Sequence, residues 1–194
     1  MNTRVLKAVA PLVLLVALLG GCSGDSSERQ RIVLEVVTVN AGNPLVAAYQ
    51  EQDETDVYYT LDSVPVVFHA RPYNQSMTIP TDGAYSSFVI TGYNLVWHPG
   101  ANVPAGLDLS QFNVENVPFF VQVPVGDDAG SSLMVADRVI KEGIGAVLGT
   151  PWTLSQDFTA YLEMQFIGHA SGDEHEVIVP AGLGVSFTFA LSRN

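Results

Sequence analysis

Residues 158–166, FTAYLEMQF, predict a β-strand that is buried on one face. Apolar side chains occupy every second position, and polar or larger amphipathic ones lie between them: Phe158, Ala160, Leu162, Met164 and Phe166 alternate with Thr159, Tyr161, Glu163 and Gln165. Successive side chains of a strand point to opposite faces of a sheet, so all five apolar side chains share one face. We therefore expect the fold to be built from strands that pack through such faces.

The chain after this strand repeats the pattern to residue 191. Residues 169–176, HASGDEHE, combine a glycine with charged side chains and predict a turn. Residues 177–182, VIVPAG, predict a short strand ended by Pro180, and residues 183–191 alternate like a further strand. Together these segments predict a C-terminal β-meander.

The same period of two continues upstream. It predicts strands at 32–39, 57–61, 64–70, 87–97, 117–125 and 131–135. Because Pro118 and Pro124 cannot donate ladder hydrogen bonds, we expect strand 117–125 at a sheet edge. The one helix candidate covers residues 136–148, where apolar side chains recur at roughly helical spacing, and a loop is the alternative because of Gly143 and Gly145.

About nine short strands separated by Gly, Pro, Asn and Asp are typical of two packed antiparallel sheets or a barrel. We expect an all-β antiparallel sandwich, immunoglobulin-like or jelly-roll-like, with at most one short helix. Residues 31–194 would form this single domain, since a chain of this length supports one sizeable core.

The N-terminus has the features of a secretory signal. Arg4 and Lys7 precede an uncharged run, residues 8–19, that is shorter than the about 20 apolar residues needed to cross a bilayer. The run ends in Leu19-Gly20-Gly21-Cys22, which contains the only cysteine of the chain.

This ending resembles the lipobox of bacterial lipoproteins. The resemblance implies that residues 1–21 are cleaved off, that the Cys22 sulfur receives a diacylglyceryl group, and that the new amino terminus is acylated. Each buried methylene of such chains contributes about 0.8 kcal/mol, so Cys22 would attach the protein to a membrane. The alternative is an uncleaved anchor helix with a free cysteine.

The residues after Cys22 bear on location. In the lipoproteins that this N-terminus resembles, an Asp directly after the cysteine commonly retains the protein in the inner membrane, whereas Ser23 stands here. The outer membrane of the cell envelope is therefore favoured. Residues 22–30 are polar and predict a short tether between lipid and domain.

The charge of the chain limits its partners. Its formal net charge is −12, and cleavage would remove two cations and no acidic residue. Such a surface repels nucleic acid and favours neutral, cationic or cation-bridged partners. Lipid on Cys22 would leave no thiol for a disulfide.

A first group of candidate metal ligands lies near the C-terminus. His169, Asp173, Glu174, His175 and Glu176 lie within one expected hairpin tip. Residues flanking an antiparallel turn can face each other, so His169 and His175 are candidates for a shared transition metal ion. A solvated polar turn is the alternative. The helical HExxH zinc motif is excluded, because Val179 stands where its second histidine would be.

Calcium is the one cofactor that the acidic loops suggest. Residues 51–56, EQDETD, and the pair Asp127 and Asp128 carry the oxygen ligands that calcium prefers. Neither loop has the spacing of an EF-hand, so exposed loops without metal are the alternative. Tyr73 and Tyr85, in turn-like surroundings, are candidates for stacking on a sugar.

No nucleophile motif such as Gly-x-Ser-x-Gly occurs in the sequence. We therefore expect a non-catalytic binding, scaffold or assembly-accessory module of the envelope, with an envelope protein or a glycan as partner. A carbohydrate- or calcium-binding surface module and, third, an envelope hydrolase are the alternatives. A long uncapped sheet edge would favour strand addition to a partner.

Overall fold

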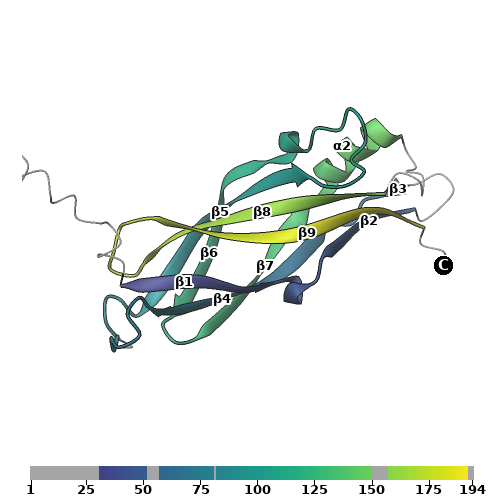
Figure 1. The fold of residues 1–194 in the computed structure, drawn as a ribbon. Helices are drawn as coiled ribbons and strands as arrows, with labels where there is room; N and C mark the ends of the chain where they lie inside the picture. The colour runs from purple at the N-terminus through teal and green to yellow at the C-terminus, as the bar shows by residue number, and fades with distance from the viewer. Residues whose placement is uncertain (1–30, 52–56, 81, 150–156, 192–194) are drawn as a thin grey trace, which may run out of the picture. The chain divides into compact units, whose positions relative to one another are not determined.

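The computed structural model describes residues 31–51, 57–80, 82–149 and 157–191. The described residues form nine strands, one α-helix and two short 3-10 helices (Figure 1). In chain order these are β1 (Ile32–Val39), η2 (Asn40–Gly42), β2 (Leu45–Glu51), β3 (Val57–Tyr58), β4 (Asp62–Pro72), β5 (Ser87–Pro99), η3 (Leu109–Phe112), β6 (Val114–Pro124), β7 (Asp128–Ala136), α2 (Arg138–Leu148), β8 (Phe158–Ala170) and β9 (Val177–Leu191). The predicted all-β class with one short helix is confirmed.

The strands form two sheets that share one hydrophobic core. The smaller sheet has the order β1-β4-β7, and the larger has the order β3-β2-β9-β8-β5-β6. The sheets touch where Phe68 of β4 meets Phe166 of β8 edge to face, with ring centroids 4.8 Å apart. Edge-to-face contact is a favourable geometry for aromatic rings, and both rings are fully buried. The predicted sandwich arrangement, and its immunoglobulin-like or jelly-roll-like type, remain predictions.

The alternation in β8 is confirmed by burial. All five apolar side chains of residues 158–166 are buried, whereas Tyr161 is about half exposed. The predicted edge position of the proline-containing strand is also confirmed, because β6 is the last strand of the larger sheet. Helix α2 occupies the segment predicted to be helical, and the Asp137 carboxylate caps it by accepting the N–H of Ile140.

Four details of the strands differ from the prediction. Pro180 does not end a strand, since β9 runs without a break from 177 to 191. Strand β2 was not expected, because its sequence lacks a clear period of two. It pairs with β9 in parallel, Leu45 opposite Val185, although all neighbours were expected to be antiparallel. Strand β3 is shorter than the predicted 57–61.

A buried lysine attaches helix α2 to three other segments. Lys141 is completely buried. Its Nζ donates to the Ala48 carbonyl of β2 at 2.6 Å and to Thr60 Oγ1 at 2.8 Å, and lies 2.7 Å from Asp62 Oδ2 of β4. Two hydrogen bonds and one ion pair with the Asp62 carboxylate therefore compensate this buried cation.

We predict that Lys141→Ala lowers the free energy of unfolding by about 3–5 kcal/mol, because the substitution leaves the largely buried Asp62 carboxylate without its cation. Urea unfolding followed by circular dichroism measures the loss. Arg138→Ala is the control on the same helix: its ion pair with Glu142 is exposed, so a much smaller loss is expected. Equal losses in the two variants would contradict the anchoring role of Lys141.

Candidate binding groove

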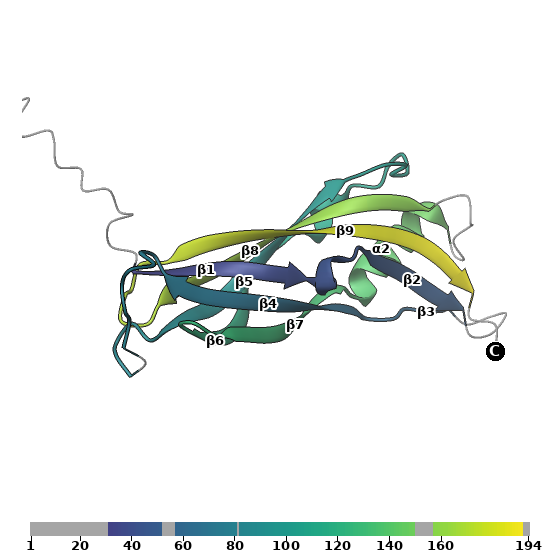
Figure 2. The ribbon, with the colours of Figure 1, turned by 60° about the horizontal axis from the view of Figure 1, so that its bottom comes forward.

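Two unpaired strand edges face each other on one side of the described domain. Among the residues that the structure describes, β1 pairs only with β4, so its other edge has no described strand neighbour. β9 pairs with β8 along residues 177–187, but β2 joins its other edge only from Val185 onward. Residues 177–184 of β9 therefore have an open edge, and Figures 1 and 2 both show β1 running beside it.

The space between the two edges is a groove of about 500 Å³. This volume lies within the range typical of ligand sites. Every side chain that lines the groove is uncharged, in contrast to the acidic chain as a whole. The lining consists of Val36, Val37, Thr38, Val39, Gly42, Asn43, Pro44, Pro180, Ala181, Gly182, Leu183 and Gly184.

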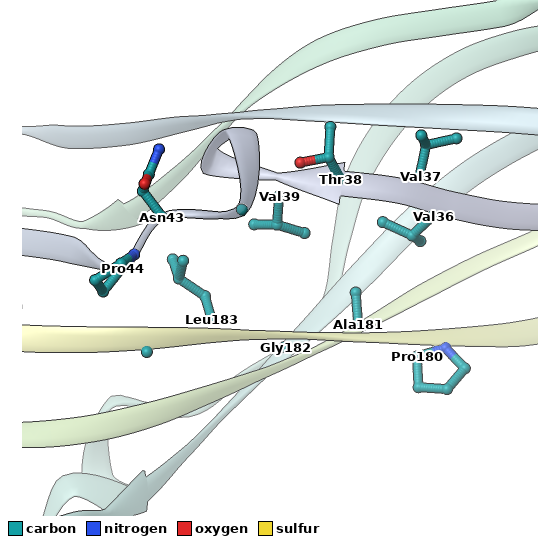
Figure 3. Close-up of a pocket in the computed structure, with 12 residues that line it drawn as sticks. Val36, Val37, Thr38, Val39, Asn43, Pro44, Pro180, Ala181, Gly182 and Leu183 are labelled. Atoms are coloured by element: carbon teal, nitrogen blue, oxygen red, sulfur yellow. The ribbon is translucent and has the colours of Figure 1, made fainter.

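The floor of the groove is apolar. Figure 3 shows Val36 and Val39 pointing from β1 toward β9, and Ala181 and Leu183 pointing from β9 toward β1. Val39 and Leu183 are buried, whereas Val36 and Ala181 are only partly covered. A guest chain would therefore complete the cover of the core at this point and gain hydrophobic free energy by doing so.

The position of Pro180 shows which backbone groups face the groove. A proline inside a sheet must turn its nitrogen away from its ladder neighbour, and Pro180 lies opposite Gln165 of β8. Its nitrogen therefore faces the groove. Backbone groups of alternate strand residues point to the same edge, so the N–H groups of Gly182 and Gly184 also face the groove.

The turn between β1 and β2 sets the end of the groove. Asn40, Ala41 and Gly42 have φ values of 50°, 53° and 79°, a left-handed conformation that redirects the chain from the smaller to the larger sheet. The Asn40 side chain holds the turn by donating to the Asn43 and Pro44 carbonyls at 3.0 and 3.2 Å. Beyond this turn, strand β2 pairs with β9 from Val185 onward, and the groove ends there.

A polar row borders the groove on the outer face of the larger sheet. A side chain at Gly182 would collide with the Tyr161 hydroxyl, so the phenol lies directly over this glycine. Glu163 stands opposite Gly182 in the neighbouring strand. Its carboxylate accepts from Gln165 Nε2 at 2.8 Å and lies 3.1 Å from His98 Nε2. These two hydrogen bonds, that from Gln165 first, lower the pKa of Glu163.

The sequence pattern predicts a strand end at Pro180 and so does not identify this groove. Tyr161 and Glu163 were expected on the polar face of their strand but without a function. The sequence does contain one signal for the groove, which is the pair Gly182 and Gly184 at outward positions of a strand. A glycine within a strand often marks the close approach of another backbone.

The predicted histidine and carboxylate cluster comes together only in part. A shallow hollow of about 560 Å³ at the tip of the β8–β9 hairpin is lined by Thr91, His169, Glu174, His175 and Glu176. Asp173 is not in this lining, and its carboxylate instead accepts the backbone N–H of His175 at 3.0 Å. Within the described ranges, no three His, Cys, Asp or Glu side chains form a group that could hold a metal ion.

Of the acidic residues considered for calcium, the structure describes the side chains of Asp127 and Asp128. Asp128 Oδ1 lies 2.7 Å from His69 Nδ1, so this carboxylate has an imidazole partner. Asp127 is exposed. Residues 52–56 of the EQDETD loop lie outside the described residues, as do Leu19, Gly20, Gly21 and Cys22 of the lipobox.

The two tyrosines proposed for sugar stacking lie beside Arg31. The Arg31 guanidinium stands 4.7 Å from the centroid of the Tyr85 ring, a cation–π contact that covers one ring face. Tyr73 is exposed, and its backbone N–H donates to the Arg31 carbonyl at 2.9 Å. Sugar stacking at these positions remains a prediction.

No protein-family model and no curated protein matches this chain. No helix in the ranges that the structure describes is long and apolar enough to cross a bilayer. Function is therefore inferred from the groove and from the residues around it.

We predict that Glu163 titrates below its ordinary pKa of 4.5 and that Gln165→Ala and His98→Ala each raise this pKa, because the hydrogen bond from Gln165 is its largest cause and the hydrogen bond and charge of His98 add to it. Carboxyl NMR titration measures both shifts. A lowered pKa in the folded state means that this carboxylate adds stability above its unfolded pKa and loses it as the pH falls through the folded value. An unchanged Glu163 pKa in Gln165→Ala would contradict the assigned hydrogen bond.

Proposed function

We propose that this protein is an envelope lipoprotein, held at the outer membrane by lipid on Cys22, that acts by binding and not by catalysis. Its partner is another envelope protein, and an extended segment of that partner adds as a strand in the groove between β1 and β9. The observation that carries the proposal is the pair of open strand edges over an apolar floor.

Strand addition fits the backbone geometry of β9. Strand β2 already pairs with this edge from Val185 onward, so the same edge is competent for pairing. A guest strand would continue along residues 177–184. Main-chain hydrogen bonds contribute about 0.5–1.5 kcal/mol each, and side chains that reach the floor add specificity.

The fold also limits unwanted pairing at this edge. Pro180 removes one donor, and Pro44 stands where β2 begins. Such prolines reduce nonspecific edge-to-edge association between sheets. A partner must therefore match the remaining donors and the floor, which favours one specific segment over indiscriminate aggregation.

The lipid anchor gives the first test. We predict that Cys22→Ala abolishes metabolic labelling with palmitate and leaves the precursor uncleaved, because the sulfur is the attachment point that the lipobox implies. Gel mobility and membrane fractionation measure the result. Unchanged labelling and fractionation of the variant would refute the lipid assignment.

The groove gives the second test. A photo-crosslinking amino acid at Val37, an exposed lining residue, should join the protein to one envelope protein in intact cells. The same group at Phe120, which is 75% exposed on β6, is the control for chance contact. We expect a discrete adduct from position 37 and none from position 120.

Gly184→Pro tests the backbone role. It removes a groove-facing N–H but no bond to β8, and we expect it to reduce the Val37 adduct at least fivefold. Gly184→Ala keeps the N–H, and a methyl group there meets only the Pro44 side chain at 3.7 Å, so we expect the adduct to persist. Thermal melts confirm that both variants fold. Equal adduct in the two variants would argue against strand addition.

A further inference from the structure

The groove also indicates which side chain a partner strand carries. This inference rests on the proposed function. A strand that pairs with the open edge of β9 directs alternate side chains to opposite faces. One set meets the apolar floor, and the other set lies on the outer face beside Gly182 and Gly184.

The outer face beside β9 carries no β9 side chain at these two exposed glycines. The Tyr161 hydroxyl occupies the space over Gly182, whereas a β-carbon at Gly184 would meet only the Pro44 side chain, at 3.7 Å, so a guest side chain can lie against the backbone at Gly184. The Tyr161 ring extends over Gly182 and is 48% exposed. This ring offers an aromatic surface at the border of the groove.

A carboxylate lies one strand further on. Glu163 stands opposite Gly182, and its side chain is 33% exposed. The bonds to Gln165 and His98 hold the carboxylate in place and favour its charged form, because they lower its pKa. The lining of the groove contains no lysine or arginine, and the basic side chain already beside this carboxylate is His98, with its Nε2 3.1 Å from Glu163 Oε2.

We propose that the partner strand carries an arginine or lysine on its outward face, in register with Gly182. Its aliphatic stem lies along the Tyr161 ring, which covers this glycine, and its charged end reaches the Glu163 carboxylate. A basic side chain uses both the aromatic surface and the carboxylate, through a cation–π contact and a charge-assisted hydrogen bond.

Other guest side chains satisfy less of this site. An apolar side chain gains from the Tyr161 ring but leaves the carboxylate without a new partner. An acidic side chain is repelled by Glu163 and by the net charge of −12 of the whole chain. Charge complementarity therefore selects a basic residue.

Peptide binding to the full-length lipoprotein in detergent tests the inference. The probe is an eight-residue peptide of alternating valine and threonine in which one threonine is replaced by arginine. The comparison peptide has the neutral isostere citrulline at that position. Fluorescence polarisation measures both affinities, and the arginine peptide should bind about tenfold more tightly, with a preference that falls as salt is added.

Two variants locate the effect. Glu163→Gln should lower the affinity of the arginine peptide to that of the citrulline peptide and leave the citrulline peptide unchanged. Glu142→Gln removes another partly exposed carboxylate, on helix α2, and should change neither affinity.

The outcomes separate the two proposals. Equal affinities for the arginine and citrulline peptides, both reduced by Gly184→Pro, would overturn the basic-residue inference and support strand addition. Binding of neither peptide would overturn strand addition and the inference with it. An arginine preference that survives Glu163→Gln would also overturn the assignment to this carboxylate.

Discussion

The unequal pairing of β9 is the constraint on which the proposed site depends. One edge of β9 is covered by β8 along residues 177–187, whereas the other edge is covered by β2 only from Val185. Every backbone polar group of a strand needs a partner, either in the protein or in water. The uncovered half of β9 therefore carries donors and acceptors that are available to a guest, and the open edge of β1 stands across from them.

Lys141, a buried residue outside the groove, helps to fix the length of the groove. Lys141 of α2 donates to the Ala48 carbonyl of β2 and pairs with Asp62 of β4. This buried ammonium ties the helix, β2 and the smaller sheet to one position, so β2 cannot slide along β9 without breaking its bond. A buried cation held by two hydrogen bonds and an ion pair favours one arrangement of its partners. The buried Lys141 contacts thus fix the position of β2, and the position of β2 sets where the groove ends.

Polar and apolar surfaces are separated around the groove. Its lining is uncharged within an acidic chain, while Glu163, Gln165 and His98 form a bonded row along its outer border. Because the groove is uncharged, a guest backbone could enter it without removing water from charged side chains of the lining. In the proposed complex, the charged row beside it would discriminate between guest side chains, because a carboxylate in a fixed position distinguishes cations from neutral groups. Affinity and selectivity would then be supplied by adjacent but different residues.

The sequence by itself determined the all-β class, the inward faces of strands such as 158–166, the edge position of the proline-containing β6 and the helix near 138–148. These follow from local period and local chemistry, which act within a few residues. Only the tertiary structure decided that β9 continues past Pro180, that β2 pairs with it in parallel, and that Gly182, Tyr161 and Glu163 border one groove. Those facts depend on which strand lies beside which, and that is settled by contacts between residues more than a hundred positions apart in the chain, such as Leu45 and Val185, which no local pattern records.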